Sequence, residues 1–138
     1  DRVAIREFTA NAPSEIIGLD HIADDQECVD IGPETIKQIE ALLEETKTVL
    51  WNGPMGVFEM NPFDNGTNKV AQAVARLTKK GQILSVAGGG DTVSALDNAG
   101  VIDDFSYIST AGGAFLEWIE GKTLPGVAAL QEASKKAA

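Results

Sequence analysis

The stretch SVAGGGDTVSAL, residues 85–96, decides both the fold class and the kind of site that this sequence predicts. An apolar, strand-like segment runs into three consecutive glycines, and a helix-like segment follows at once and stops at Gly100. Because glycine loses more backbone entropy on folding than any other residue, three in a row need a reason. Glycines between a strand and a helix bring the backbone close to a ligand at the helix N-terminus, where phosphates bind.

Strand-like and helix-like segments alternate along the rest of the chain. The strand-like segments are 3–8, a possible one at 28–31, 48–51, 82–87 and 105–109. The helix-like segments are 33–47, 67–80, 91–100, 114–121 and 125–138. This order predicts an α/β fold, in which a parallel sheet with right-handed crossovers carries helices on both faces in a Rossmann-like, three-layer arrangement.

Three of the predicted strands end in glycine-rich loops, at Gly53, Gly88 and Gly112. In a parallel sheet these loops emerge at the same carboxyl edge, which is where open α/β folds bind ligands. We therefore expect a single site built from all three loops.

The loop GGGDT, residues 88–92, predicts a phosphate cradle made by Gly88, Gly89 and Gly90. The alternative is a tight turn in which Asp91 only caps the following helix. The sequence has Ser94 where a capping box needs Glu or Gln. Since a carboxylate beside a phosphate is repulsive without a cation between them, Asp91 is interpreted as a Mg²⁺ ligand.

The loop STAGGA, residues 109–114, repeats the device one strand later. Thr110 is a candidate helix cap, and Gly112 and Gly113 open the backbone to a ligand. The alternative is close packing of a helix on a strand. Two such loops at one edge would handle phosphate groups at two points, as phosphoryl transfer requires.

The segment WNGPMGVFE, residues 51–59, offers an apolar shelf at Pro54, Met55 and Val57, followed by the carboxylate of Glu59. A shelf and an acceptor pair suit a nucleoside, with the base on the shelf and the ribose hydroxyls on the carboxylate. The alternative is a turn followed by core residues.

Charge and composition exclude several classes of function. The 138 residues carry 11 basic and 21 acidic side chains, a net charge of −10, which argues against a nucleic-acid partner. No apolar run approaches the ~20 residues of a membrane helix. The single cysteine, Cys28, fits a reducing compartment, so a cytoplasmic location is expected. Because the chain begins at Asp1 and enters a strand directly, we expect it to be a piece of a longer protein.

Common catalytic motifs fail when tested. Val93 occupies the third glycine position of a dinucleotide fingerprint, which disfavours an oxidoreductase. GKT at 121–123 lacks the first glycine of a P-loop, so Lys122 is predicted to be a surface residue. His21, the single histidine, lies in an acidic loop, and neither it nor Cys28 has partners for a metal cluster.

The motifs together resemble those of phosphoglycerate kinases, in order and in spacing, over essentially the whole chain. They are DIGP (30–33), LWNGPMGVFE (50–59), FDNGT (63–67), AGGGDT (87–92), ISTAGGAFLE (108–117) and EGKTLPGVAAL (120–130). The resemblance implies a glycolytic kinase that exchanges a phosphoryl group between 1,3-bisphosphoglycerate with ADP and 3-phosphoglycerate with ATP.

The resemblance also implies a division of labour between two lobes of a monomeric enzyme. Residues 1–138 would be the C-terminal part of the nucleotide-binding domain, and the N-terminal glycerate-binding domain would be absent from this chain. The chain would then supply the Mg-nucleotide side of the site and be inactive alone. A non-catalytic nucleotide-binding module is the alternative.

Residue roles carry over through the matching motifs. Glu59 would bind the ribose hydroxyls, Pro54 and Val57 would line the base pocket, and Asn52 would approach the nucleotide phosphates. The stretch 89–92, with Asp91 and Thr92, would bind ATP or ADP phosphates and Mg²⁺. The catalytic residues Gly112 and Gly113 would donate backbone N–H groups to the group being transferred.

Two positions depart from the family pattern. Ala111 stands where the family usually has the first glycine of its last loop, and alanine there costs energy if the position needs a positive φ. Cys28 and Val29 stand where the family often has Gly-Leu, which changes the wall of the base pocket.

Overall fold

The computed structural model describes residues 1–109 and 111–137 of the 138. Its strands are β1 (Arg2–Ile5), β2 (Ser14–Ile17), β3 (Glu27–Ile31), β4 (Thr48–Asn52), β5 (Leu84–Gly88) and β6 (Tyr107–Ser109). Its α-helices are α1 (Pro33–Glu45), α2 (Asn65–Lys79), α3 (Gly90–Asn98), α4 (Gly112–Ile119) and α5 (Pro125–Ala137), with a short 3₁₀ turn at Ile102–Asp104.

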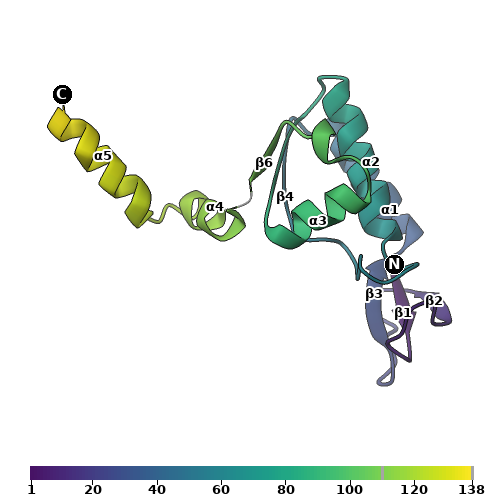
Figure 1. The fold of residues 1–138 in the computed structure, drawn as a ribbon. Helices are drawn as coiled ribbons and strands as arrows, with labels where there is room; N and C mark the ends of the chain where they lie inside the picture. Colours follow the sequence, from purple (N-terminus) through teal and green to yellow (C-terminus); the bar gives the residue numbers. More distant parts are fainter. Residues whose placement is uncertain (110, 138) are drawn as a thin grey trace.

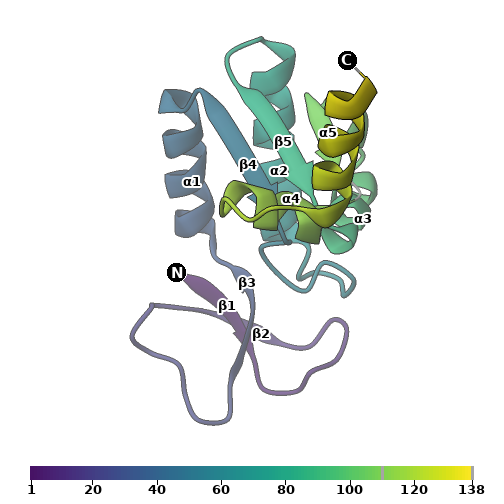
Figure 2. The same cartoon turned by 90° about the vertical axis from the view of Figure 1, so that its left-hand side faces the viewer.

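The predicted parallel sheet is confirmed, in the order β4-β5-β6. Trp51 of β4 lies opposite Ala87 of β5, and Ala87 lies opposite Ile108 of β6. Helices α1, α2 and α3 lie on one side of the sheet, and α4 and α5 lie on the other (Figures 1 and 2). The α/β class with a parallel sheet is therefore confirmed, but α4 and α5 extend away from the sheet and do not cover its second face, so the predicted three-layer arrangement is present only in part.

The N-terminal strands do not join this sheet, which corrects the interpretation of 3–8 and 28–31 as part of it. β1 pairs antiparallel with both β2 and β3, and the resulting small sheet lies below the parallel sheet in both views (Figures 1 and 2). The connections 6–13 and 18–26 contain no helix. The connection 6–13 between the paired strands β1 and β2 is shorter than the dozen or so residues that a parallel crossover needs, which favours antiparallel pairing of these two strands.

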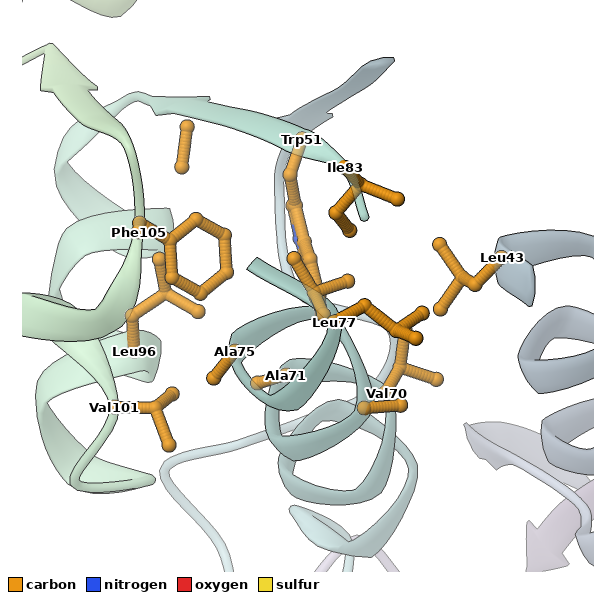
Figure 3. Close-up of a cluster of buried hydrophobic side chains, with 13 residues drawn as sticks. Leu43, Trp51, Val70, Ala71, Ala75, Leu77, Ile83, Leu96, Val101 and Phe105 are labelled. Atoms are coloured by element: carbon orange, nitrogen blue, oxygen red, sulfur yellow. The ribbon is translucent and has the colours of Figure 1, made fainter. Parts of the chain in front are cut away.

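The main core is packed around α2, whose buried side chains face both the sheet and α1 (Figure 3). α2 buries Val70, Val74 and Leu77 in this core. Trp51 and Phe105 meet edge to face across it, with ring centroids 6.3 Å apart. The core thus fixes β4 and β5, the strands that lead into the glycine loops.

A second, smaller core joins the antiparallel sheet to the long loop between β4 and α2. Phe63 from this loop is fully buried with Ile5 of β1 and Val29 of β3, and Val57 packs against the same cluster. The loop that carries the predicted apolar shelf is therefore packed in place.

One face of the parallel sheet carries exposed apolar side chains. Leu50 of β4, Leu84 of β5 and Tyr107 of β6 are 45%, 54% and 60% exposed. The register places Leu50 opposite Val86, and Val86 opposite Tyr107, so these side chains share a face. Parallel sheets normally have both faces covered.

In the described residues no helix is long and apolar enough to span a membrane.

We predict that this bare face makes the isolated 138-residue chain bind an apolar dye and self-associate. The double variant L50K/L84K should lower dye fluorescence and raise the concentration at which light scattering begins. Leu42→Lys is the matched control, because Leu42 is a comparably exposed leucine on α1. An equal change in dye fluorescence and light scattering on the Leu42 substitution would show that this face is not the surface that causes dye binding and self-association.

Candidate functional site

The carboxyl ends of the three parallel strands lie side by side. Asn52 at the end of β4 pairs with Gly88 at the end of β5, and Gly88 pairs with Ser109 at the end of β6. The loops that follow these strands therefore all begin at the same carboxyl edge of the sheet, as the sequence predicted. This edge of the sheet is the candidate site.

Gly89 makes the turn from β5 into α3. Its φ of +101° lies in a region that side chains other than glycine rarely adopt. A Cβ atom here would lie 3.0 Å from Oδ1 of Asn52 and 3.4 Å from Oγ1 of Thr92. Asn52 from the neighbouring strand thus lies beside the start of α3, and its contact with nucleotide phosphates stays a prediction.

The glycine loops that follow β5 and β6 lie in direct contact. A Cβ atom on Gly112 would lie 2.5 Å from both the Cα and the nitrogen of Gly89, so only glycine fits between them. The Gly89 N–H also donates to the carbonyl of Ser109 at 3.3 Å. The N-termini of α3 and α4 are consequently neighbours at the sheet edge.

The space in front of the two helix N-termini is open. A Cβ atom on Gly90 or on Gly113 would have no other atom within 4 Å. Helix N-termini carry unpaired N–H groups and a partial positive charge. Two such termini beside open space can receive an anionic group.

Asp91 lies in the first turn of α3 with an exposed side chain. The helix is capped at Gly89 without a side-chain hydrogen bond, so the alternative of Asp91 as the cap is wrong. Asp91 makes no side-chain hydrogen bond or ion pair with the part of the chain that the structure describes. No group of three His, Cys, Asp or Glu that could hold a metal ion occurs among the described residues. One carboxylate together with phosphate oxygens is nevertheless a usual ligand set for Mg²⁺.

Thr92 fastens the loop after β4 to α3. Its side chain is 1% exposed, and its hydroxyl oxygen accepts a hydrogen bond from the Gly53 N–H at 2.6 Å. The Thr92 hydroxyl, which was predicted to contact a phosphate, therefore already holds the loop after β4 in place. This structural use of Thr92 was not foreseen in the sequence.

The predicted base shelf faces a cleft of about 400 Å³ between β3 and residues 54–57. Pro54 and Val57 line one side, and Cys28 and Val29 line the other. The Val57 N–H donates to the Val29 carbonyl at 2.8 Å, which fixes the two walls. Glu59 is exposed and does not line this cleft.

The structure also places four other residues that the sequence analysis discussed, namely Ala111, Thr110, Lys122 and His21. Ala111 has a φ of −104°, so alanine carries no left-handed strain at the start of α4. Thr110, the candidate cap, lies outside the described residues, and the helix begins after Ala111. Lys122 is an exposed residue paired with Glu120 at 2.6 Å, as predicted. His21 is exposed.

Asp30 is a buried carboxylate that the sequence analysis missed. Its Oδ2 accepts from the Gly66 N–H at 2.7 Å, its Oδ1 accepts from the Ile31 N–H at 2.8 Å, and the residue is 5% exposed. Burial raises the pKa of Asp30 above its ordinary value; the two N–H bonds oppose that rise, and the charge of Asp64 adds to it. The sequence signal that could have identified this buried carboxylate was an acidic residue inside the otherwise apolar segment CVDI, residues 28–31.

A family model described as "Phosphoglycerate kinase" matches residues 1–122. The chain belongs to the phosphoglycerate kinase family. A phosphoglycerate kinase of Rhodospirillum centenum is 58% identical over 130 residues, and one of Methylorubrum extorquens is 57% identical over 131. These alignments cover 94% and 95% of this chain and 33% of each relative. The chain thus spans about a third of the length of these relatives.

Solved structures of phosphoglycerate kinases share the fold. The structure from Coxiella burnetii has a TM-score of 0.80 at 41% identity, covering 88% of this chain and 30% of that one. The structure from Pyrococcus horikoshii has a TM-score of 0.79 at 29% identity, covering 98% of this chain and 32% of that one. The α/β architecture is therefore the phosphoglycerate kinase one, present in part.

The contact between Gly112 and Gly89 predicts unequal effects of two alanine substitutions in α4. Gly112→Ala should lower the free energy of unfolding by about 1–3 kcal/mol, because the added methyl overpacks the start of α3. Gly113→Ala, which meets open space, should be neutral or stabilising by up to about 1 kcal/mol. Urea unfolding followed by tryptophan fluorescence measures both. Equal losses in the two variants would contradict the packing described here.

The raised pKa of Asp30 predicts a pH-dependent stability. Because the fold favours the neutral carboxyl, its contribution is complete below the ordinary pKa of 3.8 and is lost as pH rises through the higher folded value. The unfolding free energy of the parent chain minus that of Asp30→Asn should therefore be largest at acidic pH and decline as pH rises. Paired urea titrations across this range measure it. A difference that grows with pH would overturn the assignment.

Proposed function

We propose that this chain is the C-terminal part of the nucleotide-binding domain of a phosphoglycerate kinase and supplies the Mg-nucleotide side of the site. The reaction is reversible phosphoryl transfer between 1,3-bisphosphoglycerate with ADP and 3-phosphoglycerate with ATP. One observation supports the proposal most strongly: Gly112 is packed against Gly89, so the N-termini of α3 and α4 are neighbours at the carboxyl edge of the sheet.

The nucleotide phosphates bind at the start of α3. Gly88, Gly89 and Gly90 let the backbone approach them, and the Asn52 amide lies beside the same turn. The three loops 52–59, 88–92 and 109–114 contain no Lys or Arg. The positive field at the phosphates must therefore come from backbone N–H groups and a metal ion.

Asp91 is the carboxylate that fits a Mg²⁺ ion accompanying the nucleotide. It is exposed, lies in the first turn of α3, and has no competing partner in the described part of the chain. When bound, the ion neutralises phosphate charge that would otherwise repel this carboxylate. Asp91 thereby holds the Mg-nucleotide in place.

The nucleoside occupies the cleft between β3 and residues 54–57. Pro54 and Val57 give the base an apolar surface, and Val29 forms the facing wall. Glu59 follows two residues after this shelf with an exposed carboxylate, which suits the ribose hydroxyls. The base and the phosphates are then held by different loops of one site.

Gly112 and Gly113 stabilise the phosphoryl group during its transfer. Phosphoryl transfer proceeds through a loose transition state whose charge is spread over the equatorial oxygens. The N–H groups at the start of α4 are donors in fixed positions for those oxygens, and fixed donors need no rearrangement during the reaction. The acceptor and its cationic ligands belong to an N-terminal lobe outside this chain, and the full-length protein is a cytoplasmic monomer.

The role of Asp91 is tested by Asp91→Asn in a full-length kinase that carries this segment. Turnover should fall by about 100-fold or more, because Mg-nucleotide is no longer held productively. Steady-state kinetics at varied Mg-ATP measure the loss. Asp97→Asn is the control, since Asp97 is an exposed acid at the other end of the same helix. Unchanged kinetics in Asp91→Asn would contradict the assignment.

The proposal that this chain supplies only the nucleotide side of the site is tested by assaying the isolated chain for turnover. The isolated 138 residues should show no turnover with 3-phosphoglycerate and Mg-ATP, because acceptor-binding cations are not in this sequence. Turnover by the isolated chain would overturn the proposal. Mg-ADP binding without turnover even in the full-length protein would instead support a non-catalytic nucleotide-binding module.

A further inference from the structure

The loop of residues 53–64 is held by groups from three different elements, α3, α2 and β3. Gly53 is held by Thr92 of α3 at 2.6 Å, and the Met55 N–H donates to the Thr67 hydroxyl of α2 at 3.0 Å. The Val57 N–H is held by the Val29 carbonyl of β3 at 2.8 Å. Between these anchors lies Gly56, which contacts the carboxylate of Asp30. The loop is therefore a fixed surface.

Asp30 is the side chain on which this loop, β3 and α2 converge. Its Oδ2 accepts from the Gly66 N–H at the start of α2, and its Oδ1 accepts from the Ile31 N–H within β3. A Cβ atom on Gly56 or on Gly66 would overlap the carboxylate. Both glycines thus pack directly against Asp30 with no spare space.

The packing links Asp30 to the base shelf through Gly56. Gly56 lies between Met55 and Val57, so displacement of the carboxylate displaces the shelf. Asp30 itself lines the same cleft as Pro54 and Val57. The width of the cleft therefore depends on this side chain.

We propose that Asp30 is a positioning residue for the nucleotide base, because its buried carboxylate fixes residues 54–57 against the wall formed by Val29. The inference rests on the proposed function, since it assigns the cleft to a base. Asp30 lies in β3 and contacts the loop and α2, whereas the phosphate loops lie at the ends of β5 and β6. Loss of Asp30 should thus weaken base binding and spare phosphate binding.

The test compares a nucleotide with a base-free ligand in a full-length kinase that carries this segment. Dissociation constants for Mg-ADP and for magnesium pyrophosphate are measured by calorimetry in the parent, in Asp30→Asn and in Gly56→Ala. Asn offers one acceptor oxygen where two N–H groups need one each. The Gly56 methyl pushes on the intact Asp30 carboxylate and also on the Phe63 carbonyl within the same loop. In both variants the Mg-ADP constant should rise about tenfold, while the pyrophosphate constant stays within about twofold.

Asp97→Asn is the matched control, because Asp97 is an exposed acid at the C-terminal end of α3 that lies outside both the loop and the contacts of Asp30. It should leave both constants near the parent values. Where Asp30→Asn does not fold, Gly56→Ala decides. Equal losses for both ligands, or no loss for Mg-ADP, overturn the inference alone. A parent protein that binds no Mg-ADP overturns the proposed function and the inference with it.

Discussion

The start of α2 depends on a carboxylate from another element. Its own N-cap, Asp64, makes no capping hydrogen bond, and Asp30 of β3 accepts the Gly66 N–H instead. The Gly66 N–H thereby gains an acceptor, and this hydrogen bond opposes the burial that raises the pKa of Asp30. Because α2 supplies much of the main core, this contact ties the small antiparallel sheet to the layer that holds the parallel strands.

The same arrangement occurs at α1, which also lacks a side-chain cap of its own. The carboxylate of Asp1 accepts from the N–H of Thr35 at 2.8 Å and of Glu34 at 3.3 Å. Two helices of one layer thus begin on carboxylates from other parts of the chain, Asp1 just before β1 and Asp30 within β3. These contacts connect the N-terminal segment to the helices that pack on the parallel sheet.

The sequence predicted those features whose cause is local. Pro33 opens α1, and Gly100 and Gly121 follow α3 and α4 with φ of +69° and +80°, as glycine after a helix usually does. It did not predict β2, because Ser14–Ile17 is largely exposed and shows no alternation of buried residues. Nor did it find the cap at Asp30 or the contact of Gly112 with Gly89, since each joins residues far apart in the chain.

Under the proposed function, the electrostatics of the sheet edge explain how an acidic chain would hold a polyphosphate. The net charge is −10, and the three loops contain two carboxylates, Asp91 and Glu59, but no Lys or Arg. Phosphate without a cation would be repelled by Asp91, whereas N–H groups at two adjacent helix N-termini attract it over a short range. Affinity at this edge must therefore be coupled to a divalent cation. Under the proposed function, this chain would offer N–H donors to one side of a transferring phosphoryl group, and a second, cationic surface would complete the site.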